Sequence, residues 1–165
     1  MHLAETTRVL MSKKFPETGI LRPKKEIENL SGYYFFSNFT HEEISLLLLC
    51  AEQVCYEKGE VIFRESDIGL QFYAILSGEI LIRREKSGRE LARLKPGKVF
   101  GEMAVLDGHP RSATAIAASK AELFAFDAAR LLDNFPHLSV KLLRFMAREL
   151  SMRVRKADAM IDLFW

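Results

Sequence analysis

The sequence predicts a mainly β domain: an antiparallel β-roll, similar to a jelly roll, with a short helix before it and a long helix after it. Three observations support this fold class. Short apolar runs alternate with Gly-containing turns over residues 54–126, a helix-capping pattern precedes the first run, and an apolar heptad pattern follows the last one. With 165 residues, 48% of them hydrophobic, the chain suits one domain with a sizeable core and is too short for two of the usual size.

The first segment, residues 1–34, is expected to be an N-terminal extension that is partly mobile, because prolines and a glycine interrupt its polar sequence. The domain itself is then expected to span residues 35–165. Its first helix is predicted to begin after Thr40. Thr40 and Glu43 have the spacing of a capping box, and the apolar residues that follow fall on one helical face.

The strands of the roll are expected within residues 54–126, as a succession of hairpins. The predicted strands are residues 54–56, 61–63, 72–76, 80–84, 89–94, 113–118 and 122–126. Lys58-Gly59, Ser77-Gly78 and Ser87-Gly88 lie at the turns between the earlier strands. Consecutive strands joined by such turns are therefore expected to pair with each other in an antiparallel sheet.

The C-terminal helices are expected over residues 127–164. Asp127 can cap a short helix, and Asn134-Phe135-Pro136 is expected to break it before the long helix begins. The long helix carries apolar residues at alternating spacings of three and four, as in a seam between two helices. These seam residues are Val140, Leu143, Ala147, Leu150, Val154, Ala157 and Ile161.

This seam predicts a parallel homodimer through residues 140–161. Arg153 and Asp158 have the spacing at which flanking charges meet across two parallel helices, so they are expected to pair between the chains. A second apolar stripe, which includes Leu142 and Phe145, can cover the roll. The alternative is a single helix buried broadly in its own domain.

Composition excludes several other classes of protein. The formal net charge of +2 gives no strong field that would attract nucleic acid or an acidic membrane, and the basic side chains of the long helix are interpreted as a solvated face. Cys50 and Cys55 lie close together without a His cluster, which excludes a zinc pattern and indicates reduced core thiols. No apolar run reaches the length of a signal peptide or a membrane span, so a cytoplasmic protein is expected.

Residues 100–114 place a glycine, a carboxylate and an arginine close together. Gly101 lets a ligand approach the backbone, and the single helical turn expected after it can offer free N–H groups to an anion. Arg111 can add a two-pronged contact to phosphate. Glu102 repels a phosphate unless it has a donor of its own, such as a sugar hydroxyl, so the motif indicates a ribose phosphate. A surface ion pair in an ordinary loop is the alternative.

The sequence Phe-Gly-Glu-Met-Ala, followed by Pro-Arg-Ser-Ala-Thr, resembles the phosphate-binding cassette of the cyclic nucleotide-binding domain family, and the similarity extends over roughly residues 35–160. The resemblance implies that Glu102 accepts a hydrogen bond from the ribose 2′-hydroxyl and that Arg111 pairs with the cyclic phosphate. The other cassette residues expected at the ligand are Gly101, Met103, Ala104, Ser112 and Ala113. The expected ligand is cyclic AMP or cyclic GMP, with no metal and no other cofactor.

The long helix supplies one more expected ligand contact. In the catabolite activator branch of the family a Thr-Ser pair on this helix contacts adenine, and alignment through residues 146–148 places Arg153 and Val154 there. Arg153 is therefore a candidate ligand-binding residue, although the departure from Thr-Ser puts the adenine contact in doubt. Cyclic AMP is nevertheless expected in preference to cyclic GMP.

The function expected from the resemblance is a receptor or sensor that signals through the long helix to an unknown downstream protein. No output domain is expected, since the chain ends at Trp165, before a DNA-binding domain would begin. One alternative is a dimerisation or scaffold module that keeps the fold with a ligand-free pocket. An enzyme acting on nucleotides is disfavoured, because no metal ligands or general base accompany the cassette.

Overall fold

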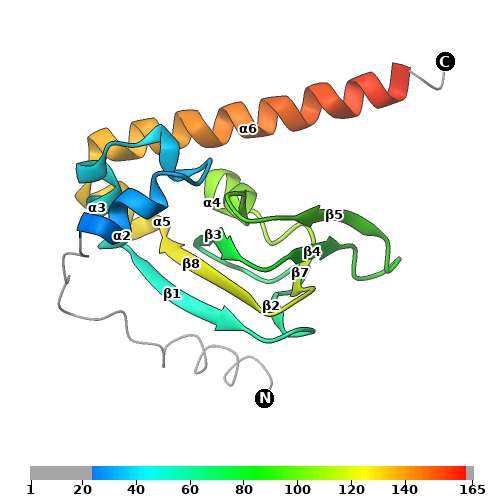
Figure 1. Ribbon diagram of the computed structural model, residues 1–165. Coiled ribbons are helices and arrows are strands. Elements are labelled where there is room, and N and C mark those ends of the chain that lie inside the picture. Colours follow the sequence, from blue (N-terminus) through cyan, green and yellow to red (C-terminus); the bar gives the residue numbers. More distant parts are fainter. Residues whose placement is uncertain (1–23, 163–165) are drawn as a thin grey trace.

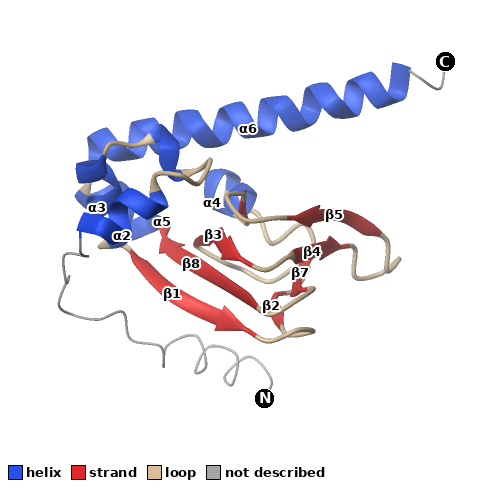
Figure 2. Cartoon of the chain, viewed as in Figure 1, coloured by secondary structure: helices blue, strands red, loops and turns tan. Residues whose placement is uncertain are grey.

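Two four-stranded antiparallel sheets form a β-roll, and helices pack on one side of it (Figures 1 and 2). The structure, a computed structural model, describes residues 24–162. The strands are β1 (Ala51–Tyr56), β2 (Val61–Phe63), β3 (Gln71–Ser77), β4 (Ile80–Arg83), β5 (Glu90–Leu94), β6 (Val99–Phe100), β7 (Thr114–Ala117) and β8 (Ala121–Asp127). One sheet has the order β1-β8-β3-β6 and the other β2-β7-β4-β5. The expected fold class, an antiparallel β-roll with flanking helices, is confirmed.

The prediction that consecutive strands pair as successive hairpins is wrong for most of the roll. Among the strands of residues 24–162, only β4 and β5 pair as neighbours in the chain, whereas β1 and β3 both pair with β8, and β2 and β4 both pair with β7. Residues after Gly59 therefore cross from one sheet to the other. A Gly-containing turn reverses the chain, but it does not determine which sheet receives the next strand.

Strands β3 and β8 lie at the centre of their sheet and are buried on both faces. Along β8, Leu123 and Ala125 face the opposite sheet, while Phe124 and Phe126 face the helices. Side chains alternate across a strand, so a strand covered on both faces has a continuous apolar sequence. The rings of Phe72 on β3 and Phe126 on β8 stack with centroids 4.8 Å apart on the helical side.

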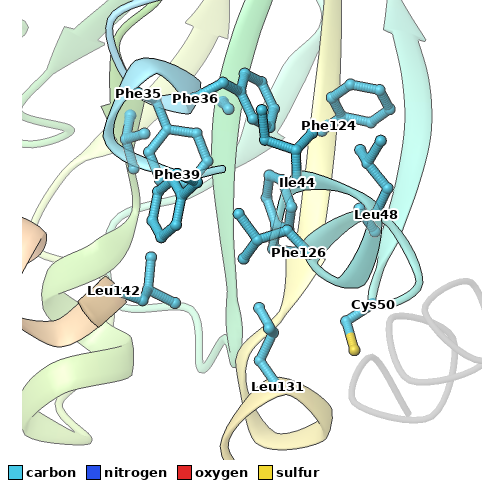
Figure 3. Packing of buried hydrophobic residues seen from close by; sticks show 14 of the residues in the cluster. Phe35, Phe36, Phe39, Ile44, Leu48, Cys50, Phe124, Phe126, Leu131 and Leu142 are labelled. Atoms are coloured by element: carbon cyan, nitrogen blue, oxygen red, sulfur yellow. The ribbon is translucent and has the colours of Figure 1, made fainter. Parts of the chain in front are cut away.

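Helices cover the outer face of this sheet around a cluster of phenylalanines (Figure 3). They are α2 (Lys24–Leu30), the 3-10 turn η1 (Phe36–Asn38), α3 (His41–Leu48), α5 (Ala128–Asn134) and α6 (Pro136–Asp162). Phe35 is fully buried at the centre, and its ring packs edge-on against five others, including Phe145 of α6. This cluster holds the first part of α6 against the sheet.

The expected N-terminal extension is partly structured. Within residues 24–34, α2 forms a helix whose Ile27 and Leu30 are buried in the phenylalanine cluster, so this part belongs to the packed domain. The rest of the expected mobile segment, residues 1–23, lies outside the described residues.

Local helix signals in the sequence are confirmed. Thr40 and Glu43 form the complete capping box of α3, and the Asp127 side chain caps α5. The break expected at Asn134-Phe135-Pro136 is also confirmed, because α5 ends at Asn134 and α6 begins at Pro136. Proline is well suited to the first position of a helix, where no backbone N–H is needed.

Two further expectations concern the cysteines and the membrane. Cys50 is buried in the core, but Cys55 is exposed, which corrects its assignment as a core thiol. Cys55 alternates along β1 with buried Val54, so it points to the opposite face of the strand. Between residues 24 and 162, no helix combines the length and the apolar sequence needed to cross a membrane.

We predict that Thr40→Ala lowers the free energy of unfolding by about 1 kcal/mol, because it removes one half of the capping box. Urea denaturation followed by circular dichroism measures this difference. Thr40→Ser is the matched control, since it keeps the hydroxyl that accepts from the Glu43 N–H. Equal losses in the two variants would show that the methyl group, not the cap, stabilises the helix.

Candidate functional site

Residues 100–114, here called the cassette, connect β6 to β7 around a single-turn helix, α4 (Glu102–Asp107). Gly101 precedes this helix with φ of +79° and Gly108 follows it with φ of +69°. Both values lie in the left-handed region, which glycine adopts without steric cost. The two glycines therefore allow the chain to enter and leave the turn sharply between two strands.

Arg111 points into the protein and is held by backbone carbonyls. Its Nη1 donates to the Gly101 carbonyl and its Nη2 to the Gln71 carbonyl, both at 2.6 Å. The guanidinium also lies over the ring of Phe63, with 4.2 Å between its carbon and the ring centroid. These contacts fix the plane of the guanidinium between β3, β2 and the start of α4.

The charge of Arg111 is buried without a carboxylate partner in the described part of the chain. Only 5% of the residue is exposed, and its Nε has no hydrogen-bond partner among residues 24–162. Burial lowers the pKa of the Arg111 guanidinium, while Tyr73, Asp67 and Glu102 act in the opposite direction from a distance. An arginine remains charged under these conditions, so this position favours an anion.

The loop of residues 64–70, between β2 and β3, is a part of the site that sequence reasoning missed. The Arg111 N–H donates to the Asp67 carbonyl, and the Ser66 N–H donates to the Arg111 carbonyl, each at 2.8 Å. Gly69 leaves the space through which the arginine side chain passes, because a Cβ there would lie 2.5 Å from Nη2. An isolated glycine 42 residues before Arg111 gives no signal of this contact in the sequence.

Arg84 is a second residue that the sequence did not indicate. Its Nη1 donates to the Ser112 carbonyl at 2.7 Å, which fixes the backbone directly after Arg111. Thr114 continues this hydrogen-bond network. Its hydroxyl accepts from the Glu65 N–H at 2.9 Å and donates to the Glu85 carboxylate. Groups from the β4–β5 turn and from the loop after β2 thus hold the end of the cassette.

Glu102 lies at the first position of α4 and pairs with the long helix. Its side chain is 3% exposed, and its Oε1 accepts from Nη1 of Arg153 at 2.5 Å. Nη2 of Arg153 is also 3.4 Å from the Val99 carbonyl. Within this chain Arg153 therefore pairs with Glu102, and its expected pairing with Asp158 of a second chain stays a prediction.

The remaining candidate residues surround these two charged groups. Ala104 and Ala113 are buried, whereas Met103 and Ser112 are exposed. The structure thus brings Gly101, Glu102, Arg111 and Arg153 together through direct hydrogen bonds. No group of His, Cys, Asp or Glu side chains within residues 24–162 has the arrangement of a metal site.

The aromatic floor beneath Arg111 is apolar. Phe63, Tyr73 and Phe100 pack together, with Tyr73 and Phe100 stacked at 5.2 Å, and burial raises the pKa of Tyr73 to about 12. Tyr73 is therefore neutral at physiological pH. The site thus combines a buried cation above neutral rings with a nearby carboxylate. The cation can bind a negatively charged group of a ligand, and the carboxylate can accept hydrogen bonds from hydroxyl groups of the same ligand.

Comparison with known families identifies this fold. The family model described as "Cyclic nucleotide-binding domain" matches residues 53–135, just over half of the chain, including the whole cassette. The chain belongs to the cyclic nucleotide-binding domain family.

Relatives within this family are regulators. The cyclic AMP receptor protein of Thermus thermophilus is 35% identical over 140 residues, which cover 81% of this chain and 63% of that protein. The crystal structure of the catabolite activator protein from the same species superposes with a TM-score of 0.64 at 36% identity and covers 79% of this chain and 62% of that one. A cyclic nucleotide-binding domain from Methylobacillus flagellatus superposes with a TM-score of 0.67 at 26% identity, covering 81% and 80%. The chain thus spans less than two thirds of the Thermus protein.

We predict that Gly69→Ala displaces the Arg111 guanidinium and lowers the free energy of unfolding by about 1 kcal/mol, the value of one hydrogen bond. The new Cβ would lie within 2.8 Å of three guanidinium atoms. Gly32→Ala is the matched control, because its Cβ would meet only the Asn29 carbonyl at 3.4 Å. Urea denaturation of both variants measures the difference in the free energy of unfolding. Equal midpoints would show that the Arg111 side chain does not need a glycine at position 69.

Proposed function

We propose that this cyclic nucleotide-binding domain is a receptor, with cyclic AMP preferred over cyclic GMP, and that it signals through α6. In this proposal Arg111 binds the cyclic phosphate and Glu102 accepts from the ribose 2′-hydroxyl. The other cassette residues contact the ligand through backbone groups or, for Ser112, its hydroxyl: Gly101, Met103, Ala104, Ser112 and Ala113. In this proposal the domain binds the nucleotide, and a downstream protein responds to α6.

The buried charge of Arg111 is the observation that supports the proposal most directly. A buried cation without a paired anion is costly, and two carbonyls with one aromatic ring compensate only part of the lost hydration. The Nε–H is left without an acceptor in the described residues. A ligand phosphate would supply both the opposite charge and the missing acceptor.

The preference for cyclic AMP rests on the relatives. The Thermus relative is named as a cyclic AMP receptor, and a 35% identical relative from Mycobacterium tuberculosis as a cyclic AMP-activated transcriptional regulator. Arg153 and Val154, where catabolite activators have the Thr-Ser pair, are the residues of this chain that depart from that pattern.

We predict that Arg111→Ala weakens cyclic AMP binding by about 3 kcal/mol, or roughly 150-fold, because it removes the charged partner of the phosphate. Isothermal titration calorimetry measures the affinity, and circular dichroism verifies the fold. Arg89→Ala removes an exposed arginine on the β4–β5 turn and serves as the control. If Arg111→Ala binds as tightly as the parent, the role given to the cassette is wrong.

The same titrations with cyclic GMP test the ligand preference. Cyclic GMP binding at least tenfold tighter, about 1.4 kcal/mol, would contradict the preference for cyclic AMP while leaving the receptor function intact. Ligand well above its dissociation constant should also raise the melting temperature of the parent. A parent that gains no stability from either nucleotide would favour the scaffold function considered next.

A scaffold with a ligand-free pocket is the second candidate function. It is favoured by one observation: Glu102 and Arg111, the two groups proposed to hold ligand, both have partners within the chain. In a scaffold these contacts would be permanent. The receptor and the scaffold therefore differ in whether a nucleotide replaces any of these contacts of Glu102 and Arg111.

We further propose a parallel homodimer through the seam at residues 140–161. The stripe of α6 formed by Leu138, Leu142 and Phe145 is buried on the sheet, whereas Val140 and Val154 of the seam are 60% and 59% exposed. The two stripes lie on different faces, so the domain leaves the seam available to a second copy. Burial of these apolar side chains would supply the driving force.

We predict that Leu150→Glu shifts the protein toward monomer, since it places a charge in the middle of the seam. Sedimentation velocity at several concentrations measures the shift. Met152→Glu is the matched control, because position 152 lies on the opposite side of the helix from the seam and is also exposed. A monomeric parent, or a Leu150→Glu variant that dimerises as the parent does, would contradict the proposed interface.

A further inference from the structure

Arg153 joins the long helix to the cassette at a single ion pair. The pair is asymmetric: the Glu102 side chain is 3% exposed and that of Arg153 is 47% exposed. The oxygen that Arg153 occupies belongs to the carboxylate proposed to accept from the ribose. In this proposal the nucleotide and the long helix therefore compete for the same buried carboxylate, that of Glu102.

The rest of α6 is held elsewhere. Lys141 pairs with Glu43 at 2.6 Å, Arg148 donates to Asn38 at 2.7 Å, and Glu149 accepts from Tyr34 at 2.8 Å. All three partners belong to the helical segment before the roll. After Arg153, residues 154–159 are all exposed, and this end of the helix projects from the domain (Figure 1). Arg153 lies at the boundary between the packed and the projecting parts of α6.

We propose that the Arg153–Glu102 ion pair is a latch that holds α6 on the cassette until a nucleotide displaces it. The proposal rests on the proposed role of Glu102 as the ribose acceptor. When a ribose hydroxyl donates to Glu102, the buried carboxylate exchanges one donor for another and stays satisfied. The half-exposed guanidinium, in contrast, can be hydrated once released.

This asymmetry determines which element responds. Glu102 is fixed in α4 and covered by the roll, so it cannot follow Arg153 out to solvent without losing its burial. Arg153 lies directly before residues 154–159 of α6, which are all exposed. Displacement of the latch therefore changes the position or mobility of the projecting helix, which is the element proposed to carry the signal.

Hydrogen exchange in the protein without nucleotide tests whether the ion pair holds the helix. Arg153→Gln should raise the exchange rate of backbone amides around residues 150–158 severalfold relative to the parent. Arg155→Gln removes the same charge from an exposed position two residues away and should exchange as the parent does. Equal rates in the parent and in Arg153→Gln would overturn the latch, whether or not the domain binds a nucleotide.

Affinity for cyclic AMP tests the competition. Arg153→Gln should bind about fivefold more tightly than the parent, the factor that corresponds to about 1 kcal/mol for an ion pair with one partly exposed member. Arg155→Gln should bind as the parent does. Weaker binding by Arg153→Gln would overturn the latch and make Arg153 a ligand contact. If neither the parent nor Arg153→Gln binds a cyclic nucleotide, the receptor function and the competition both fail, and the ligand-free exchange rates show separately whether the helix is latched.

Discussion

The buried guanidinium of Arg111 is the contact on which the site depends, because it joins three segments that are distant in the chain. Its two Nη atoms bind carbonyls of Gln71 and Gly101, and its own backbone pairs with the loop of residues 64–70. The side chain occupies space that a Cβ at Gly69 or at Gly101 would fill. The Arg111 side chain thus explains why both of these positions, which lie in separate loops, need a residue without a Cβ.

The two-sided burial of β3 and β8 determines where the helices lie relative to this site. One face of these strands packs in the roll, and the other packs on the phenylalanine cluster around Phe35. Because Phe145 of α6 belongs to that cluster, the direction of the helix is fixed two turns before Arg153. The Arg153–Glu102 contact is therefore a consequence of the apolar core as well as of two opposite charges.

The sequence was sufficient to predict those features that depend on residues close together in the chain. The capping box at Thr40 and the cap at Asp127 involve groups three residues apart, and the cassette is a contiguous motif. Strand pairing could not be derived, because it joins residues up to 75 positions apart, such as Ala51 and Phe126. The partners of Arg111 and Glu102 were missed for the same reason: Gln71 contributes only a carbonyl, which every residue has, and Arg153 lies 51 residues after Glu102.

The latch and the dimer seam occupy the same turn of α6, so the two proposals are not independent. Arg153 is adjacent to Val154 of the seam, and its spacing to Asp158 suits a pair between parallel chains. In the proposed dimer, Glu102 and Asp158 of the second chain would compete for the Arg153 guanidinium. If nucleotide releases Arg153 from Glu102 as proposed, the guanidinium becomes available to a second chain. Under these two proposals, linkage requires that dimerisation favour ligand binding to the same extent as ligand binding favours the dimer.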